Sequence, residues 1–357
     1  MSFRTRRVLF MTPLYMLFYF FLLKYTCLLL GGLWDGYVLL LTILLGLLHF
    51  TPMLFESQKS RKLTRFLSTL YGVWMWISVM LLIDVVVIYV VGGFINISQG
   101  AVLALLAVIP ILGIYNYYKA HNLVVNEKTL VIDNLNQEIN IVHLSDIHFG
   151  SVRHKQIIED VASKLKDLEN TCEIAIISGD LADGSCIVEK DDFMAFEDVE
   201  MPIVFTPGNH DYYPGIENVI DACKKAGIIV LDNDKFEFKN LNIYGLTFSF
   251  GDIEMPTAEE LGMCIKPEMV NVINYHVPYY WEEFSSLGFD IQLSGHTHGG
   301  QFYPVVWFGK RMFGYNKGLF KNKLGKYLHV TTGVGSMDTP MRWGTDSEIV
   351  ILKLRKQ

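Results

Sequence analysis

Long apolar stretches dominate the first third of the chain, whereas short apolar runs alternate with polar turns in the rest. Four of the long stretches reach or approach the roughly 20 residues that a helix needs to cross the hydrocarbon core of a bilayer. They cover residues 8–30, 37–55, 66–91 and 99–118. The second stretch begins soon after the first, which disfavours a cleavable signal peptide. The pattern predicts a multi-pass membrane region with four helical spans in residues 1–120.

Positive charge around these stretches predicts their orientation in a cell membrane. Lys and Arg residues gather before the first stretch and between the second and third, at Arg4, Arg6, Arg7, Lys59, Arg61, Lys62 and Arg65. The other two loops, 34–36 and 92–98, contain neither Lys nor Arg. Because Lys and Arg in short loops are retained on the cytoplasmic side, we expect both termini and the C-terminal part to face the cytoplasm.

Beyond residue 137, short apolar runs followed by amphipathic segments indicate a layered α/β fold. Buried strands are expected at 139–144, 173–177, 203–206, 270–275 and 291–293, and a helix at 155–168. The predicted organisation is a transmembrane region in 1–120, a linker or lead-in strand in 121–137 and an α/β domain in 138–357.

Charge and cysteine content narrow the possible partners. Residues 1–118 hold eight Lys or Arg and three Asp or Glu, and the 22 basic and 34 acidic residues that follow give a net charge of −12. Nucleic acid is therefore not expected as a partner, since its binding depends on Lys and Arg. The five cysteines form no Cys-x-x-Cys pair, which argues against a thiolate zinc site and a disulfide scaffold.

A polar cluster follows each of the five expected strands. The clusters are Ser145-Asp146-Ile147-His148, Ser178-Gly179-Asp180-Leu181-Ala182-Asp183, Gly208-Asn209-His210-Asp211, Tyr275-His276-Val277-Pro278 and Gly295-His296-Thr297-His298-Gly299-Gly300-Gln301. Ligands of α/β folds bind at the carboxyl ends of strands, so these clusters are expected to converge. Imidazole and carboxylate ligands without thiolates suit ions such as Zn, Fe and Mn. The sequence thus predicts a metal site.

The order Asp-x-His, Gly-Asp-x-x-Asp, Gly-Asn-His-Asp, isolated His and Gly-His-Thr-His resembles the signature of the calcineurin-like metallophosphoesterases. The resemblance covers residues 138–355 and implies an α/β/β/α sandwich. The continuation Gly-Gly-Gln after the last motif, with residues 327–335 and 340–344, resembles the membrane-attached YkuE/YaeI-like branch of that family.

The resemblance also implies a site that holds two divalent metal ions, either Mn, Zn, Fe or Mg. One ion would bind Asp146, His148, Asp180 and His298, and the other would bind Asp180, Asn209, His276 and His296. His210 would stabilise the transition state or protonate the leaving oxygen, and Asp183 would orient it. The implied function is hydrolysis of a phosphomonoester, phosphodiester or pyrophosphate by metal-activated water, and a lipid-linked phosphorylated substrate is one candidate.

Several alternatives stay open on sequence alone. A catalytically weak, metal-binding membrane sensor or scaffold is the alternative function. Asp211 supports the site from behind the ligands or simply forms a turn, and Arg342 contacts a phosphate or lies on the surface. His143 is expected to pack in the core, and His329 shows no partner pattern.

Overall fold

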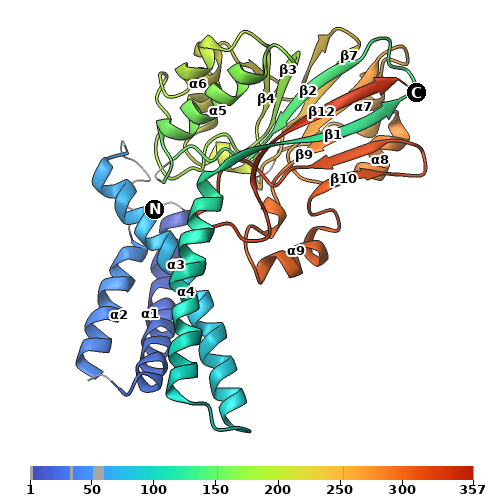
Figure 1. The fold of residues 1–357 in the computed structure, drawn as a ribbon. Helices are drawn as coiled ribbons and strands as arrows, with labels where there is room; N and C mark the ends of the chain where they lie inside the picture. Colours follow the sequence, from blue (N-terminus) through green and yellow to red (C-terminus); the bar gives the residue numbers. More distant parts are fainter. Residues whose placement is uncertain (1–2, 33–34, 51–59, 151, 252, 357) are drawn as a thin grey trace.

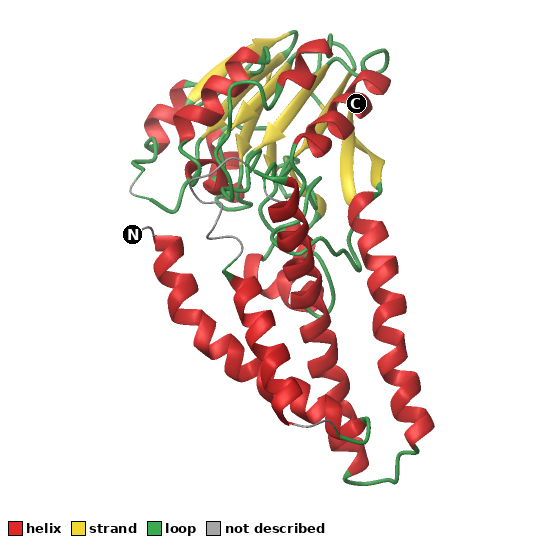
Figure 2. Cartoon of the chain, turned by 90° about the vertical axis from the view of Figure 1, so that its left-hand side faces the viewer, coloured by secondary structure: helices red, strands yellow, loops and turns green. Residues whose placement is uncertain are grey.

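Four helices at the N-terminus form a bundle that extends away from two β-sheets (Figures 1 and 2). The computed structural model describes residues 3–32, 35–50, 60–150, 152–251 and 253–356. The helices of the bundle are α1 (Phe3–Leu29), α2 (Asp35–His49), α3 (Lys62–Gly92) and α4 (Gln99–His121).

Among the described residues, three helices are long and apolar enough to cross a membrane. They are Val8–Leu29 within α1, Lys62–Gly92 and Gln99–His121. The fourth predicted span begins with α2, a shorter apolar helix of 15 residues, and the remainder of that span, residues 51–55, lies outside the described residues. Three of the four predicted spans are therefore confirmed as helices of sufficient length, and the fourth is confirmed only as a helix to His49.

Two six-stranded sheets make up the rest of the chain. The first has the strand order β1 (Leu123–Ile132), β12 (Ser347–Lys356), β2 (Ile139–Leu144), β3 (Ile174–Ser178), β4 (Ile203–Thr206) and β5 (Ile229–Val230). The second has the order β10 (Gly318–Lys321), β11 (Tyr327–Val330), β9 (Ile291–Ser294), β8 (Val270–Tyr275), β7 (Leu241–Leu246) and β6 (Asp234–Phe238). Strands β2 to β5 are parallel, as are β7, β8, β9 and β11.

Alternation along the strands explains how the sheets pack. In β3, Ile174 and Ile176 point into an apolar core shared with strands of the second sheet, whereas Ala175 and Ile177 point into a core shared with helices. Successive strand residues face opposite sides, so a strand that is apolar throughout can be covered on both faces.

Helices complete the outer layers. α5 (Lys155–Leu168) and α6 (Ile216–Lys225) cover the first sheet, and α7 (Ala258–Met263) and α8 (Trp281–Leu287) cover the second. The remaining helical segments are η2 (Met194–Asp198), η3 (Asn209–Tyr212), η4 (His298–Gly300) and α9 (Val305–Phe313). The arrangement is the α/β/β/α sandwich that the resemblance to the metallophosphoesterases implies.

The bundle and the first sheet are joined by more than a linker. β1 follows α4 after one residue, and its ten residues pair in parallel with β12. Lys119 of α4 forms an ion pair with Asp346, and the main-chain N–H of Arg342 donates to the carbonyl of Asn116 at 3.1 Å. Met341 also packs against apolar side chains of α3 and α4. The end of α4 is thereby attached to the chain that leads into β12.

Candidate metal centre

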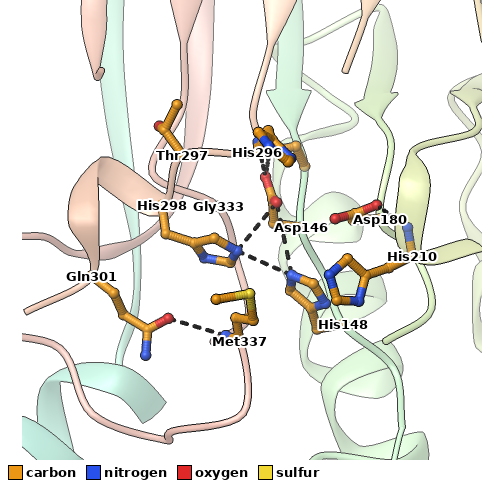
Figure 3. Close-up of polar contacts among 12 residues, drawn as sticks. Asp146, His148, Asp180, His210, His296, Thr297, His298, Gln301, Gly333 and Met337 are labelled. Carbon is orange, nitrogen blue, oxygen red and sulfur yellow. Dashed lines mark hydrogen bonds and ion pairs between the residues drawn. The ribbon is translucent and has the colours of Figure 1, made fainter. Parts of the chain in front are cut away.

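The predicted ligands meet where the carboxyl ends of the two sheets come together. Asp146 and His148 follow β2, Asp180 follows β3, and Asn209 begins η3 after β4. The second sheet supplies its ligands after β8 and β9, namely His276, His296 and His298. Figure 3 shows several of these side chains converging on Asp146 and Asp180.

One ligand group contains Asp146, His148 and His298, all buried. Asp146 Oδ1 lies 3.7 Å from His148 Nε2 and 3.3 Å from His298 Nε2, and the two Nε2 atoms are 3.1 Å apart. A second group contains Asp180, His276 and His296. There, His276 Nε2 lies 3.1 Å from Asp180 Oδ2 and 3.2 Å from His296 Nδ1.

A third group links the first two, because it combines His148 and Asp180 with His210. His148 therefore belongs to one outer group and to the linking group, and Asp180 belongs to the other outer group and to the linking group. Asp180 thus lies beside both outer groups, and the prediction that it contacts two ions stays a prediction.

The donor atoms present fit divalent cations. Asn209 Oδ1 is buried, and among the described residues it has no hydrogen-bond partner. Asp146 Oδ1 is also buried, and it faces the Nε2 atoms of two further predicted ligands, His148 and His298. Buried oxygens without a partner are rare in native proteins and call for an explanation. Coordination to a cation would satisfy both oxygens, and imidazole nitrogens with carboxylate oxygens form a donor set for Zn, Fe or Mn.

The main chain is strained at the ligands. Positive φ angles occur at Asp146 (50°), His148 (53°), Asp180 (53°), His296 (68°) and His298 (48°). Residues other than glycine rarely adopt this left-handed conformation, which costs of order 1–3 kcal/mol each and is concentrated at functional sites. The strain turns each side chain from its strand end toward the shared centre.

His210 lies beside these groups, with its ring perpendicular to that of His148 and the ring centroids 4.9 Å apart. Its main-chain N–H donates to Asp180 Oδ1 at 2.8 Å. Its Nδ1 lies 3.0 Å from the main-chain carbonyl oxygen of Asp183. The Asp183 carboxylate accepts hydrogen bonds from Ser185. The main chain of Asp183 therefore contacts His210. The resemblance implied that Asp183 orients His210 but did not indicate that the contact is made by the main chain.

Asp211 supports the site from behind the ligands, which resolves the alternatives that the sequence left open. Its fully buried carboxylate accepts hydrogen bonds from the main-chain N–H groups of Asp180, Ala182 and Gly208 at 2.8–2.9 Å. Burial, followed by the negative charge of Asp180, raises the pKa of Asp211 to about 7. Asp211 thus joins the loop after β3 to the loop after β4.

Both interpretations of Arg342 are wrong, because its side chain is fully buried. The guanidinium donates to main-chain carbonyls of Thr332, Gly333, Gly335 and Asp346. Burial lowers the pKa of Arg342 to about 10. The sequence could not indicate this role, because every residue type has a main-chain carbonyl and the sequence does not show which carbonyls accept a hydrogen bond. The arginine organises the segment that backs Asp146, since a Cβ on Gly333 would lie 2.7 Å from Asp146 Cβ.

Comparison with known proteins agrees with this geometry. The calcineurin-like phosphoesterase family profile matches residues 139–300. An uncharacterized metallophosphoesterase of Aquifex aeolicus is 30% identical over 257 residues, which cover 69% of this chain and 97% of that protein. One from Helicobacter pylori is 26% identical over 236 residues, covering 64% of this chain and 63% of its own length.

A relative from Danio rerio is named a transmembrane protein with metallophosphoesterase domain. It is 26% identical over 278 residues, covering 71% of this chain and 62% of that protein. This chain thus spans less than two thirds of the Helicobacter and Danio relatives, and the narrower YkuE/YaeI-like assignment stays a prediction. The near-complete coverage of the Aquifex protein and the profile match across every predicted site residue lead to one conclusion: the chain belongs to the calcineurin-like phosphoesterase family.

Proposed function

We propose that this protein is a membrane-anchored, metal-dependent phosphoric ester hydrolase with two divalent ions. The observation that carries the proposal is the pair of ligand groups joined by His148 and Asp180, with the buried Asn209 Oδ1 left without a hydrogen-bond partner among the described residues. Divalent ions bound there would activate a water molecule and neutralise charge on the phosphoryl oxygens.

The predicted ligands divide into one set for each ion, with Asp180 in both sets. Asp146, His148 and His298 would hold one ion together with Asp180, and Asp180 would hold the other. The second ion's remaining ligands would be Asn209, His276 and His296. The Asp211 carboxylate keeps the loops after β3 and β4 in place before substrate arrives, because it accepts hydrogen bonds from main-chain N–H groups of both loops.

His210 can supply a proton to the leaving oxygen. A carbonyl oxygen only accepts hydrogen bonds, so the contact with Asp183 O requires a proton on His210 Nδ1. The Nε2 atom is then the one left for the substrate. In the imidazolium form, Nε2 carries a proton that it can donate to the departing oxygen, as a general acid does.

The position of the site beside the bundle supports a substrate presented at a membrane. A small pocket next to the metal centre is lined by His148, by Pro340 and by the last two residues of α4, Ala120 and His121. A neighbouring open cleft is lined by both basic and acidic side chains, among them Arg65 of α3 and Arg153, which is paired with Asp160. We infer a multi-pass arrangement with the site on the cytoplasmic side and a phosphorylated, lipid-linked substrate.

Metal dependence tests the proposal. The protein is purified in detergent, stripped of metal and restored with Mn, Zn, Fe or Mg singly, and hydrolysis of bis-p-nitrophenyl phosphate, p-nitrophenyl phosphate and phospholipid extracts is followed. We expect at least one ion to restore turnover. Asp180→Asn should abolish it while circular dichroism stays unchanged, and the control Asp198→Asn, at an exposed ion pair, should retain it. Absence of hydrolysis with every ion would instead favour the sensor or scaffold.

A further inference from the structure

Helix α9 carries a concentration of exposed apolar side chains outside the bundle. Trp307, Phe308 and Met312 are 70%, 53% and 66% exposed. The opposite side of the helix packs inward, where Gly309 is buried. Lys310 and Arg311 add positive charge to the same short helix. Large exposed apolar side chains gathered in one place mark an interaction surface.

The segment before α9 is anchored on the bundle. Phe302 packs in the cluster that contains Trp76 and Met80 of α3. Tyr303 then contacts Trp307, with ring centroids 5.0 Å apart. Figure 1 shows α9 below the two sheets, on the side from which the bundle extends. The segment that leads into α9 therefore lies against α3 at the level of Trp76.

The length of α3 indicates where that level falls in a bilayer. Its 31 residues span about 46 Å at roughly 1.5 Å per residue, whereas the hydrocarbon core is only about 30 Å thick. About 20 residues counted back from Gly92 reach Val73, so the part from Lys62 to Gly72 extends beyond the core on the side of the sheets. Trp76 then lies about one turn inside the core, and α9 lies near the boundary between headgroups and acyl chains.

We propose that α9 is an interfacial helix that inserts Trp307, Phe308 and Met312 into the lipid layer around the bundle. The proposal rests on the membrane-spanning arrangement in the proposed function. Short amphipathic helices with Trp and Phe on one side and basic residues nearby bind at this depth. Tryptophan favours the interface because its ring is apolar and its N–H can stay hydrated. Lys310 and Arg311 favour a leaflet with anionic headgroups.

Insertion of α9 into the lipid layer would affect the metal centre, because the helix contacts the turn that carries two of the predicted ligands. Phe313, the last residue of the helix, meets the ring of His296 edge-on, with centroids 5.7 Å apart. Gly300 of η4 is also in close contact with α9, since a Cβ there would lie 2.7 Å from Val306 Cα. A helix held in the lipid layer would thus hold the turn that carries two predicted ligands, His296 and His298, facing the membrane.

Fluorescence quenching tests the proposal with the full chain in liposomes whose acyl chains carry bromine. The chain has six tryptophans, so the contribution of Trp307 is obtained as the difference between the wild type and Trp307→Phe. We expect this difference signal to be quenched by the brominated lipid. The control is Trp281→Phe, because Trp281 is buried in α8 against Tyr315, and its difference signal should not be quenched. Lys310→Glu with Arg311→Glu should reduce the Trp307 quenching in anionic liposomes.

Two results would overturn the proposal. If the Trp307 difference signal is unquenched while the tryptophans that remain in Trp307→Phe are quenched, the spans are in the bilayer but α9 is not. The same result together with a Trp307 signal that changes with the protein-to-lipid ratio would assign the helix to contact with a second copy. If no tryptophan is quenched, the membrane-spanning arrangement itself fails, and hydrolysis in detergent would still report separately on the catalytic proposal.

Discussion

At the scale of single residues, the carboxylate of Asp211 holds together the two loops that present Asp180 and Asn209. It accepts three buried main-chain hydrogen bonds. Asp211→Ala leaves these N–H groups without an acceptor, at about 1–3 kcal/mol each, so we expect several kcal/mol of lost stability and weaker metal retention. Thermal unfolding and measured metal content check this. Asp221→Ala, at an exposed ion pair on α6, should change stability by no more than about 0.5 kcal/mol.

A buried histidine pair gives the protein a pH dependence of its own. His143, which packs in the core as predicted, faces His329 with 2.6 Å between their Nδ1 atoms. Burial lowers the pKa of His329 to about 4, against about 6.5 in an unfolded chain. The folded state therefore binds fewer protons between these values. The resulting stability is complete above about pH 6.5 and is lost as the pH falls toward 4.

We therefore expect the wild type to be less stable at pH 5 than at pH 7, and His329→Gln to reduce that difference. The effect follows about 1.4 kcal/mol per pKa unit, so it amounts to at most a few kcal/mol. Unfolding midpoints at the two pH values measure it. Equal pH dependence in the wild type and in the variant would show that this pair does not titrate as described.

At the scale of elements, the loop of residues 337–341 connects α3 to the ligand turn. Gln301 donates to the carbonyls of Thr339 and Met341. It also accepts a hydrogen bond from the N–H of Met337 (Figure 3). Gly72 permits the close approach of α3 to this loop, because a Cβ there would lie 2.4 Å from the carbonyl oxygen of Asp338. The loop of residues 337–341 thus contacts both α3 of the bundle and the turn that carries predicted ligands.

Gly72→Ala should push this loop away from the bundle. A steric clash with main-chain atoms costs about 1–3 kcal/mol, and we expect lower thermal stability together with reduced metal-dependent hydrolysis. Gly100→Ala is the matched control, since a Cβ at Gly100 in α4 meets no atom within 4 Å. If the two variants behave alike in thermal unfolding and turnover, the contact at Gly72 does not matter for the site.

At the scale of the whole molecule, the charge pattern predicts a cytoplasmic site. Cys172, Cys186 and Cys223 are buried. Cys264 lies beyond the bundle and is partly exposed, so it reports on the side of the membrane that the sheets occupy. In a Cys27→Ser background, a membrane-impermeant maleimide should label inside-out vesicles but not intact cells. Labelling of intact cells that Cys264→Ser abolishes would place the sheets outside.

The sequence by itself indicated the apolar helices, one further helix, five of the strands and the polar clusters that follow those strands. Apolar period and length are local properties, so the helix at 155–168 and strands such as β2 and β4 could be placed from them. The ligand motifs could be found because each one follows a strand and contains metal-binding side chains.

Only the tertiary structure decided what depends on contacts between distant segments. The pairing of β1 with β12 and the pair of His143 with His329 join residues about 190 to 220 positions apart. The burial of Arg342 against carbonyls and the approach of the loop at Asp338 to Gly72 likewise involve main-chain atoms that every residue type shares. Such contacts leave no periodic or compositional signal, because the free energy that selects them comes from packing in the folded chain.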